Sequence, residues 1–293
     1  MNHKYLVTGG CSFSEASGPW AYELGINHYN VSNLARGGSG NEFIRRQVIF
    51  KVSELLKKGI PSNEILVGVQ WTGIARIDLF VSEEEIVTEN KFHTDFEIDN
   101  IGHETHPANS GSYFAPLEWN WNFDKHDYGW IHSGGGDDFV KEWSAETFES
   151  RYFQKYFKYF MTHNQGWSNF LYNVLMVQWF CKSNNISLFN FTGWNLIDTD
   201  NGRIYIDNNV EKFPESRHLW DMIDQNNFIF YKSGILNVKK EKDLKGQESP
   251  YGGMWQYLTE YNGINLDDDH PSVDGQSMWG NFLKGELIKR KII

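Results

Sequence analysis

The sequence predicts an α/β fold organised around a central parallel β-sheet, because short apolar runs alternate with amphipathic stretches along the chain. The runs KYLVTGG (residues 4–10) and NEILVGVQW (63–71) are typical of buried strands. A helical segment lies between them, and this strand–helix–strand order indicates a right-handed crossover with parallel strands. A third run of the same kind, ISLFNFTGW (186–194), follows another helical stretch.

The segment between the first two strands carries the start and stop signals of a helix. Ser39 and Glu42 stand in the S-x-x-E relation of a capping box, and Gly59 follows the segment as a C-terminal stop. Apolar residues repeat on one face of the segment, at Ile44, Val48, Val52 and Leu55. We therefore expect a helix that packs this face against the sheet.

Further helices are predicted in the second half of the chain. One opens with an acidic first turn at 144–146, and a second runs from roughly Trp167 to Lys182 into the third strand. The final 29 residues, 265–293, indicate a loop that enters an amphipathic helix.

The domain organisation is predicted from the chain length and from two stretches that lack a regular hydrophobic pattern. The chain has 293 residues, enough to bury one substantial core, and no repeat or linker divides it. Segments at about 80–140 and 196–258 are interpreted as insertions. We expect a single domain over residues 1–293 that carries both of them.

The charge balance argues against two classes of partner. The chain has 27 Lys and Arg residues against 38 Asp and Glu residues, a net charge of −11 that repels nucleic-acid phosphates and anionic membranes. No signal-peptide core and no apolar run of about 20 residues is present, so we expect a soluble protein with no membrane partner. The two cysteines, Cys11 and Cys181, do not indicate a disulfide framework. Twelve Trp residues favour aromatic-lined surfaces that bind sugars or proteins.

The stretch TGGCSFSEASG (residues 8–18) offers a nucleophile directly after the first strand. A nucleophilic serine needs a turn that exposes its hydroxyl, and Gly9 and Gly10 permit such a turn before Ser12. The alternative nucleophiles on the same stretch are Cys11, Ser14 and Ser17.

The stretch DDDHPS (residues 267–272) offers a base and its orienting acid. Asp267 stands three residues before His270, so its carboxylate can accept from one ring nitrogen while the other nitrogen faces the site. Asp268 or Asp269 could replace Asp267 in this role.

Three blocks in order, GGCSFS, NLARGGSGN and DDDHPS, together resemble the SGNH (GDSL-like) hydrolase superfamily. The resemblance implies a three-layer, flavodoxin-like fold with the site at the carboxyl ends of the strands. It implies that Ser12 is the nucleophile and that Asp267 and His270 complete a triad. It also implies an oxyanion hole formed by the N–H groups of Ser12 and Gly38, with Gly37 as the alternative to Gly38.

The sequence departs from the family pattern at two positions. Cys11 replaces the usual aspartate of the G-D-S block, a substitution associated with viral and environmental members. Thr72 stands where the family has an asparagine that donates to the oxyanion, and its shorter side chain can still donate one hydrogen bond there, which makes Thr72 the third expected member of the oxyanion hole. The residues that could fill this role instead are Gln70, Asn41 and Arg76.

Metal and cofactor motifs are not supported. The histidines of HETH (residues 103–106) are three apart, unlike those of a zinc-protease helix, and the GGSG of the second block lacks the Lys-Ser/Thr of a P-loop. We therefore expect no metal and no organic cofactor.

The combined prediction is an esterase that cleaves a carbohydrate or other small acyl ester through a Ser12 acyl-enzyme. One alternative is a catalytically impaired binding or virion structural protein on the same fold, which would have an assembly partner or form an oligomer. Another is an O-acyltransferase that uses the same residues. These functions correspond to a cytoplasmic or virion-associated protein.

Overall fold

The computed structural model describes residues 3–15, 19–25, 29–74, 76–82, 112–116, 128–133, 163–196, 214–233, 249–261, 263–264 and 270–293. The predicted helix that opens at 144–146 lies outside these residues. Within the described part, no helix is both long enough and apolar enough to cross a membrane.

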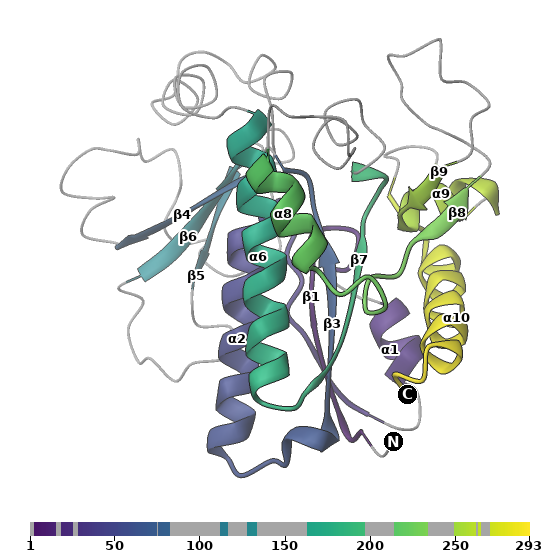
Figure 1. The fold of residues 1–293 in the computed structure, drawn as a ribbon, viewed down its shortest axis with the longest axis horizontal. Coiled ribbons are helices and arrows are strands. Elements are labelled where there is room, and N and C mark those ends of the chain that lie inside the picture. The colour runs from purple at the N-terminus through teal and green to yellow at the C-terminus, as the bar shows by residue number, and fades with distance from the viewer. Residues whose placement is uncertain are drawn as a thin grey trace.

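A four-stranded parallel sheet forms the centre of the molecule (Figure 1). Its strands are β1 (Tyr5–Gly9), β2 (Asn30–Asn33), β3 (Ile65–Trp71) and β7 (Ser187–Thr192). They pair in the order β2-β1-β3-β7. This confirms the parallel α/β class, and the order is compatible with a flavodoxin-like sheet.

Helices cover both faces of this sheet. Those packed on one face are α2 (Asn41–Lys57), α6 (His163–Ser183) and α8 (Pro214–Met222). Those packed on the other face are α1 (Pro19–Gly25), α9 (Met254–Glu260) and α10 (Val273–Lys289). A short 3₁₀ turn, Ser62–Glu64, leads into β3.

Both predicted insertions contain regular structure in their described parts. In the first, β4 (Ile77–Ser82), β5 (Ser112–Pro116) and β6 (Tyr128–Ser133) form an antiparallel sheet in the order β4-β6-β5. The second includes α8 and a hairpin-like pair, β8 (Tyr231–Ser233) and β9 (Ser249–Gly252).

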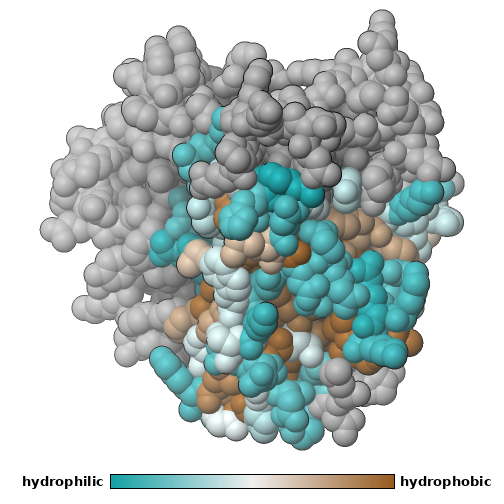
Figure 2. Space-filling model, in the orientation of Figure 1, coloured by the Kyte–Doolittle hydropathy of each residue, from teal (hydrophilic) through white to brown (hydrophobic). Residues whose placement is uncertain are grey.

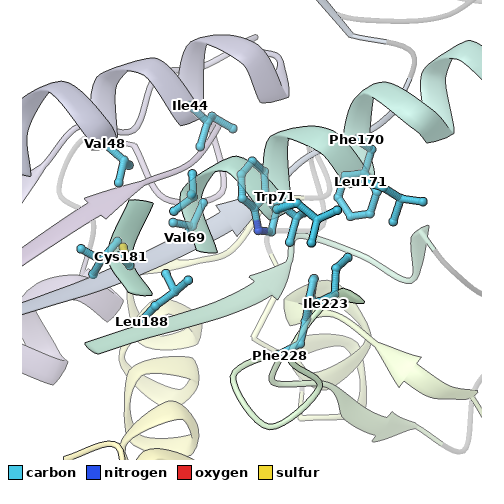
Figure 3. Close-up of a cluster of buried hydrophobic side chains, with 14 of the residues drawn as sticks. Ile44, Val48, Val69, Trp71, Phe170, Leu171, Cys181, Leu188, Ile223 and Phe228 are labelled. Atoms are coloured by element: carbon cyan, nitrogen blue, oxygen red, sulfur yellow. The ribbon is translucent and has the colours of Figure 1, made fainter. Parts of the chain in front are cut away.

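Alternation along β3 divides the apolar residues between two cores. Val67 and Val69 face the helices α2 and α6, whereas Leu66 faces α1 and α10. Figure 3 shows the first of these cores, where Trp71 and Phe170 lie together between the sheet and α6. Their rings pack edge to face with centroids 6.2 Å apart.

On the outer side of α6 and α8, hydrophilic and hydrophobic side chains are interspersed over the described surface (Figure 2). The exposed apolar side chains of α6 are Tyr172, Met176 and Trp179.

The start of α2 differs from the predicted capping box. The N-cap residue is Gly40, and Ser39 donates its hydroxyl to the carbonyl of Arg36 instead. The capping acceptor is Asp78 of β4, whose carboxylate accepts from the N–H groups of Gly40 and Phe43 at 2.7 and 2.8 Å. A carboxylate from another element therefore replaces the local serine.

The end of α2 is as predicted. Gly59 adopts a positive φ of 82° after the last turn. Its N–H donates to Leu56 and the N–H of Ile60 donates to Leu55, the two bonds of a Schellman motif.

Candidate active site

Ser12 lies in a tight turn directly after β1. The turn is closed by the N–H of Ser14, which donates to the carbonyl of Cys11 at 2.8 Å. The carboxyl ends of the parallel strands meet at this edge of the sheet, where α/β proteins bind ligands. The Ser12 side chain is half-buried, so its hydroxyl is placed at a surface and not within the core.

His270 reaches Ser12 from the opposite end of the chain. Its Nε2 lies 3.0 Å from Ser12 Oγ, although 258 positions separate the two residues. This is the distance of a hydrogen bond between a hydroxyl and an imidazole. The structure therefore brings together the two residues that the sequence proposed as nucleophile and base.

Ser272, two residues after His270, joins Gly263 to the start of α10 through hydrogen bonds. Ser272 donates both its N–H and its hydroxyl to the carbonyl of Gly263, each at 3.0 Å. The same hydroxyl accepts from the N–H of Gly275 and so caps α10. A Cβ at Gly275 would lie 2.0 Å from the Gly263 carbonyl oxygen, so only glycine permits this approach.

Two contacts join this region to the Ser12 turn. Gln276 of α10 donates its side-chain amide to the carbonyl of Phe13 at 2.7 Å, and this bond is buried. The Phe13 ring also lies against the His270 ring, with centroids 5.4 Å apart. Both contacts limit the movement of His270 relative to Ser12.

The two other described nucleophile candidates are fully buried. Cys11 has no exposed surface, and its thiol accepts from the Gln70 amide at 3.4 Å. Ser14 donates to Gln70 Oε1 at 3.1 Å and accepts from the indole N–H of Trp20 at 2.8 Å. These bonds give both side chains a structural role, which leaves Ser12 as the one of the three that reaches a surface. Ser17 lies outside the described residues.

Gln70 is the centre of the hydrogen bonds that hold the turn. Its Oε1 accepts from the N–H of Cys11 at 2.9 Å as well as from Ser14, and its Nε2 donates to the carbonyl of Trp71 at 2.8 Å. With its amide engaged at both ends, Gln70 holds the position of the turn. The sequence contained a signal for this role, because Gln70 is a polar residue inside a fully buried strand.

The glycine block after β2 lies beside the Ser12 turn. The N–H of Arg36 donates to the carbonyl of Gly10 at 3.1 Å, and Asn33 donates its amide to the carbonyl of Ser14 at 2.8 Å. Gly38 has a positive φ of 73°, a conformation that side chains disfavour. Within the described residues, the N–H groups of Ser12 and Gly38 form no hydrogen bond. These are the two donors that the family resemblance implied for an oxyanion.

Thr72 is held by Asn41 at the end of β3. Its N–H donates to Asn41 Oδ1 at 2.9 Å, and its carbonyl accepts from Asn41 Nδ2 at 3.0 Å. The Thr72 hydroxyl is fully buried and has no hydrogen-bond partner within the described chain. The amides of Asn41 and Gln70 are thus bound to other groups, and Arg76 donates to the carbonyl of Ser39.

The predicted acid Asp267 and its alternatives, Asp268 and Asp269, lie outside the described residues. The structure therefore describes the hydroxyl and the imidazole of the predicted triad, and the identity of the carboxylate stays a prediction.

No protein-family model and no curated protein matches the chain. Among solved structures, the protein YxiM from Bacillus subtilis is similar over 99% of this chain and 57% of its own, with 12% identity and a TM-score of 0.39.

Proposed function

We propose that this protein is a serine esterase of the SGNH type, with a single three-layer, flavodoxin-like domain and with Ser12 and His270 as nucleophile and base. The observation that carries the proposal is the 3.0 Å contact between Ser12 Oγ and His270 Nε2. It is supported by the half-buried position of Ser12 at the carboxyl ends of parallel strands.

The reaction uses these groups in two steps. Ser12 Oγ attacks the ester carbonyl while His270 Nε2 takes the hydroxyl proton. The N–H groups of Ser12 and Gly38 donate to the oxyanion of the tetrahedral intermediate. When the intermediate collapses, the bond to the alcohol breaks and His270 returns the proton to the leaving oxygen, which leaves an acyl group on Ser12.

Water then completes the cycle. His270 takes a proton from water, the resulting nucleophile attacks the acyl carbonyl, and Ser12 leaves with the proton from His270. We assign Asp267 the role of holding the His270 ring through its second nitrogen. No metal or organic cofactor takes part in this sequence of steps.

Covalent labelling tests the proposal directly. A fluorophosphonate reacts with an activated serine, so the labelled peptide should contain Ser12, as mapped by mass spectrometry. Ser12→Ala should abolish both labelling and hydrolysis of short 4-nitrophenyl esters. Ser53→Ala is the matched control, because Ser53 donates to Ile49 within α2 and takes no part in the site.

Three further variants separate the possible acids, and the wild-type protein tests the binding-protein alternative. Asp267→Asn should lower the acylation rate by orders of magnitude, whereas Asp268→Asn and Asp269→Asn should change it little. Labelling at another residue, or a folded wild-type protein that neither labels nor hydrolyses esters, would overturn the esterase proposal.

A further inference from the structure

Arg76 lies next to the proposed oxyanion loop. It follows β3, and its Nη1 donates to the carbonyl of Ser39 at 3.3 Å, one residue beyond Gly38. Its guanidinium carbon lies over the Trp194 ring, 5.6 Å from the ring centroid. The side chain is half-buried, so its planar fork is held in place without being enclosed.

Trp194 connects Arg76 to the reacting pair through one other ring. The Phe13 ring packs edge to face against Trp194, with centroids 5.6 Å apart, and lies tilted against His270, with centroids 5.4 Å apart. Trp194 also lies close to Gly73, where a Cβ would be 3.1 Å from the indole. A continuous row of side chains thus runs from the Arg76 guanidinium through Trp194 and Phe13 to the imidazole of His270.

The charge of Arg76 is not neutralised by the described part of the chain, within which its guanidinium forms no ion pair. Asp78, two residues further on, directs its two oxygens to the N–H groups at the start of α2. A guanidinium fork binds carboxylates in a bidentate manner, and within the described part of the chain the Arg76 fork retains donors for this purpose.

We propose that Arg76, stacked on Trp194, binds a carboxylate of the substrate, so that the enzyme prefers esters of acidic compounds such as acylated uronic acids. This proposal rests on the proposed esterase function, which supplies the reacting pair. A carboxylate bound by Arg76 would lie beside the Gly38–Ser39 peptide and orient the ester toward Ser12.

Two matched probe pairs test the preference. One pair is 4-acetoxybenzoate and its uncharged analogue 4-acetoxybenzamide; the other is an acetylated methyl glucuronoside and the corresponding acetylated methyl glucoside. Arg76→Met should lower kcat/KM for the charged member of a pair on the order of 10- to 100-fold, mainly through KM, and leave the neutral member nearly unchanged. Arg76→Lys should retain part of the preference, since it keeps the charge and loses the fork.

The controls separate local charge from net charge. Lys289→Met removes one positive charge from an exposed side chain at the end of α10 and should not alter the preference. Added salt should reduce the preference of the wild-type protein, because the side chain is partly exposed, and should have no such effect on Arg76→Met.

A binding measurement keeps the test independent of turnover. The wild-type protein should bind 4-hydroxybenzoate more tightly than 4-hydroxybenzamide, and Arg76→Met should bind both equally. Equal losses for charged and neutral esters would mean that Arg76 acts on the oxyanion or the loop and would overturn the subsite. Labelling of Ser12 without any charge preference in rate or binding would also overturn it while leaving the esterase proposal intact.

Discussion

At the scale of single residues, the side-chain amide of Gln70 provides one hydrogen-bond acceptor for two buried donors of the Ser12 turn. It satisfies the N–H of Cys11 and the hydroxyl of Ser14, both buried, from a strand next to the turn. A Cβ at Gly10 would lie 2.8 Å from Gln70 Oε1, so the turn lies directly on this amide. The conformation of the turn therefore depends on a residue 58 positions beyond Ser12.

Gln70→Leu should lower both stability and reactivity. Leaving the Cys11 N–H and the Ser14 hydroxyl without their acceptor should reduce the free energy of unfolding by about 2 to 4 kcal/mol, measured by urea denaturation. The rate of fluorophosphonate labelling should fall as well, because the turn is no longer held. Gln225→Leu, at an exposed position, should change stability by no more than about 0.5 kcal/mol. Equal effects of the two substitutions would contradict the role given to Gln70.

His3 provides a test by pH at the far end of the sheet. Its Nε2 lies 3.0 Å from the hydroxyl of Ser187, which joins the start of β1 to the start of β7. Burial, and secondarily the positive charge of the N-terminus, lowers the pKa of His3 below its ordinary value of 6.5. The folded protein therefore resists protonation of His3 more than the unfolded chain does.

The stabilising contribution of neutral His3 should be complete above about pH 6.5 and decrease as the pH falls through the lowered pKa. The unfolded chain takes up the proton first, so acid favours unfolding. His3→Gln should make the free energy of unfolding fall less between about pH 8 and about pH 5 than it does in the wild-type protein, as followed by urea denaturation. Identical pH slopes for the two proteins would show that His3 is not buried in its neutral form.

At the scale of elements, α2 is positioned by a carboxylate from β4. Asp78→Ala should leave the N–H groups of Gly40 and Phe43 without an acceptor and lower the free energy of unfolding by about 1 to 3 kcal/mol. Asp78→Asn should lose less, because one acceptor oxygen remains. The matched control is Asp221→Ala on α8, where the side chain is 52% exposed and the change should stay within about 0.5 kcal/mol. A larger loss at Asp221 than at Asp78 would refute the capping role.

The same helix shows which features local sequence can predict. Its apolar face and its Gly59 stop depend on neighbours within a few residues, and both are confirmed. Its start depends on Asp78, 38 positions from Gly40, and the local pair of Ser39 and Glu42 was therefore misleading. The edge strand β2 was not predicted either, because its sequence NVSN is mostly polar and, with four residues, too short to show the alternation of apolar and polar residues typical of a strand.

The candidate site likewise contains residues that short motifs predict and contacts that depend on the tertiary structure. Ser12 and His270 could be proposed from short motifs, because each motif is local and their order along the chain is informative. The bond from Gln276 to the carbonyl of Phe13 could not, since neither residue carries a recognisable motif. The row from Arg76 to Trp194 likewise depends on the parallel arrangement of strands that are far apart in sequence.

At the scale of the whole molecule, the two cysteines report on opposite sides of the sheet. Cys181 is buried in the core between the sheet and the helices α2 and α6, and burial raises the pKa of its thiol to about 12. Cys11 is buried in the other core, with α1 and α10. Thiol reactivity of the two residues can therefore follow the two cores separately.

Native protein should react with iodoacetamide at neither thiol, because alkylation requires an accessible thiolate. In urea, each thiol should react in proportion to the fraction of molecules in which its own core is open. If residues 1–293 form one cooperative domain, Cys11 and Cys181 should become reactive over the same range of urea concentration, as measured by mass spectrometry of the two peptides. Reaction of one thiol at clearly lower urea would mean that the two faces of the sheet unfold separately, and the single-domain proposal would then be wrong.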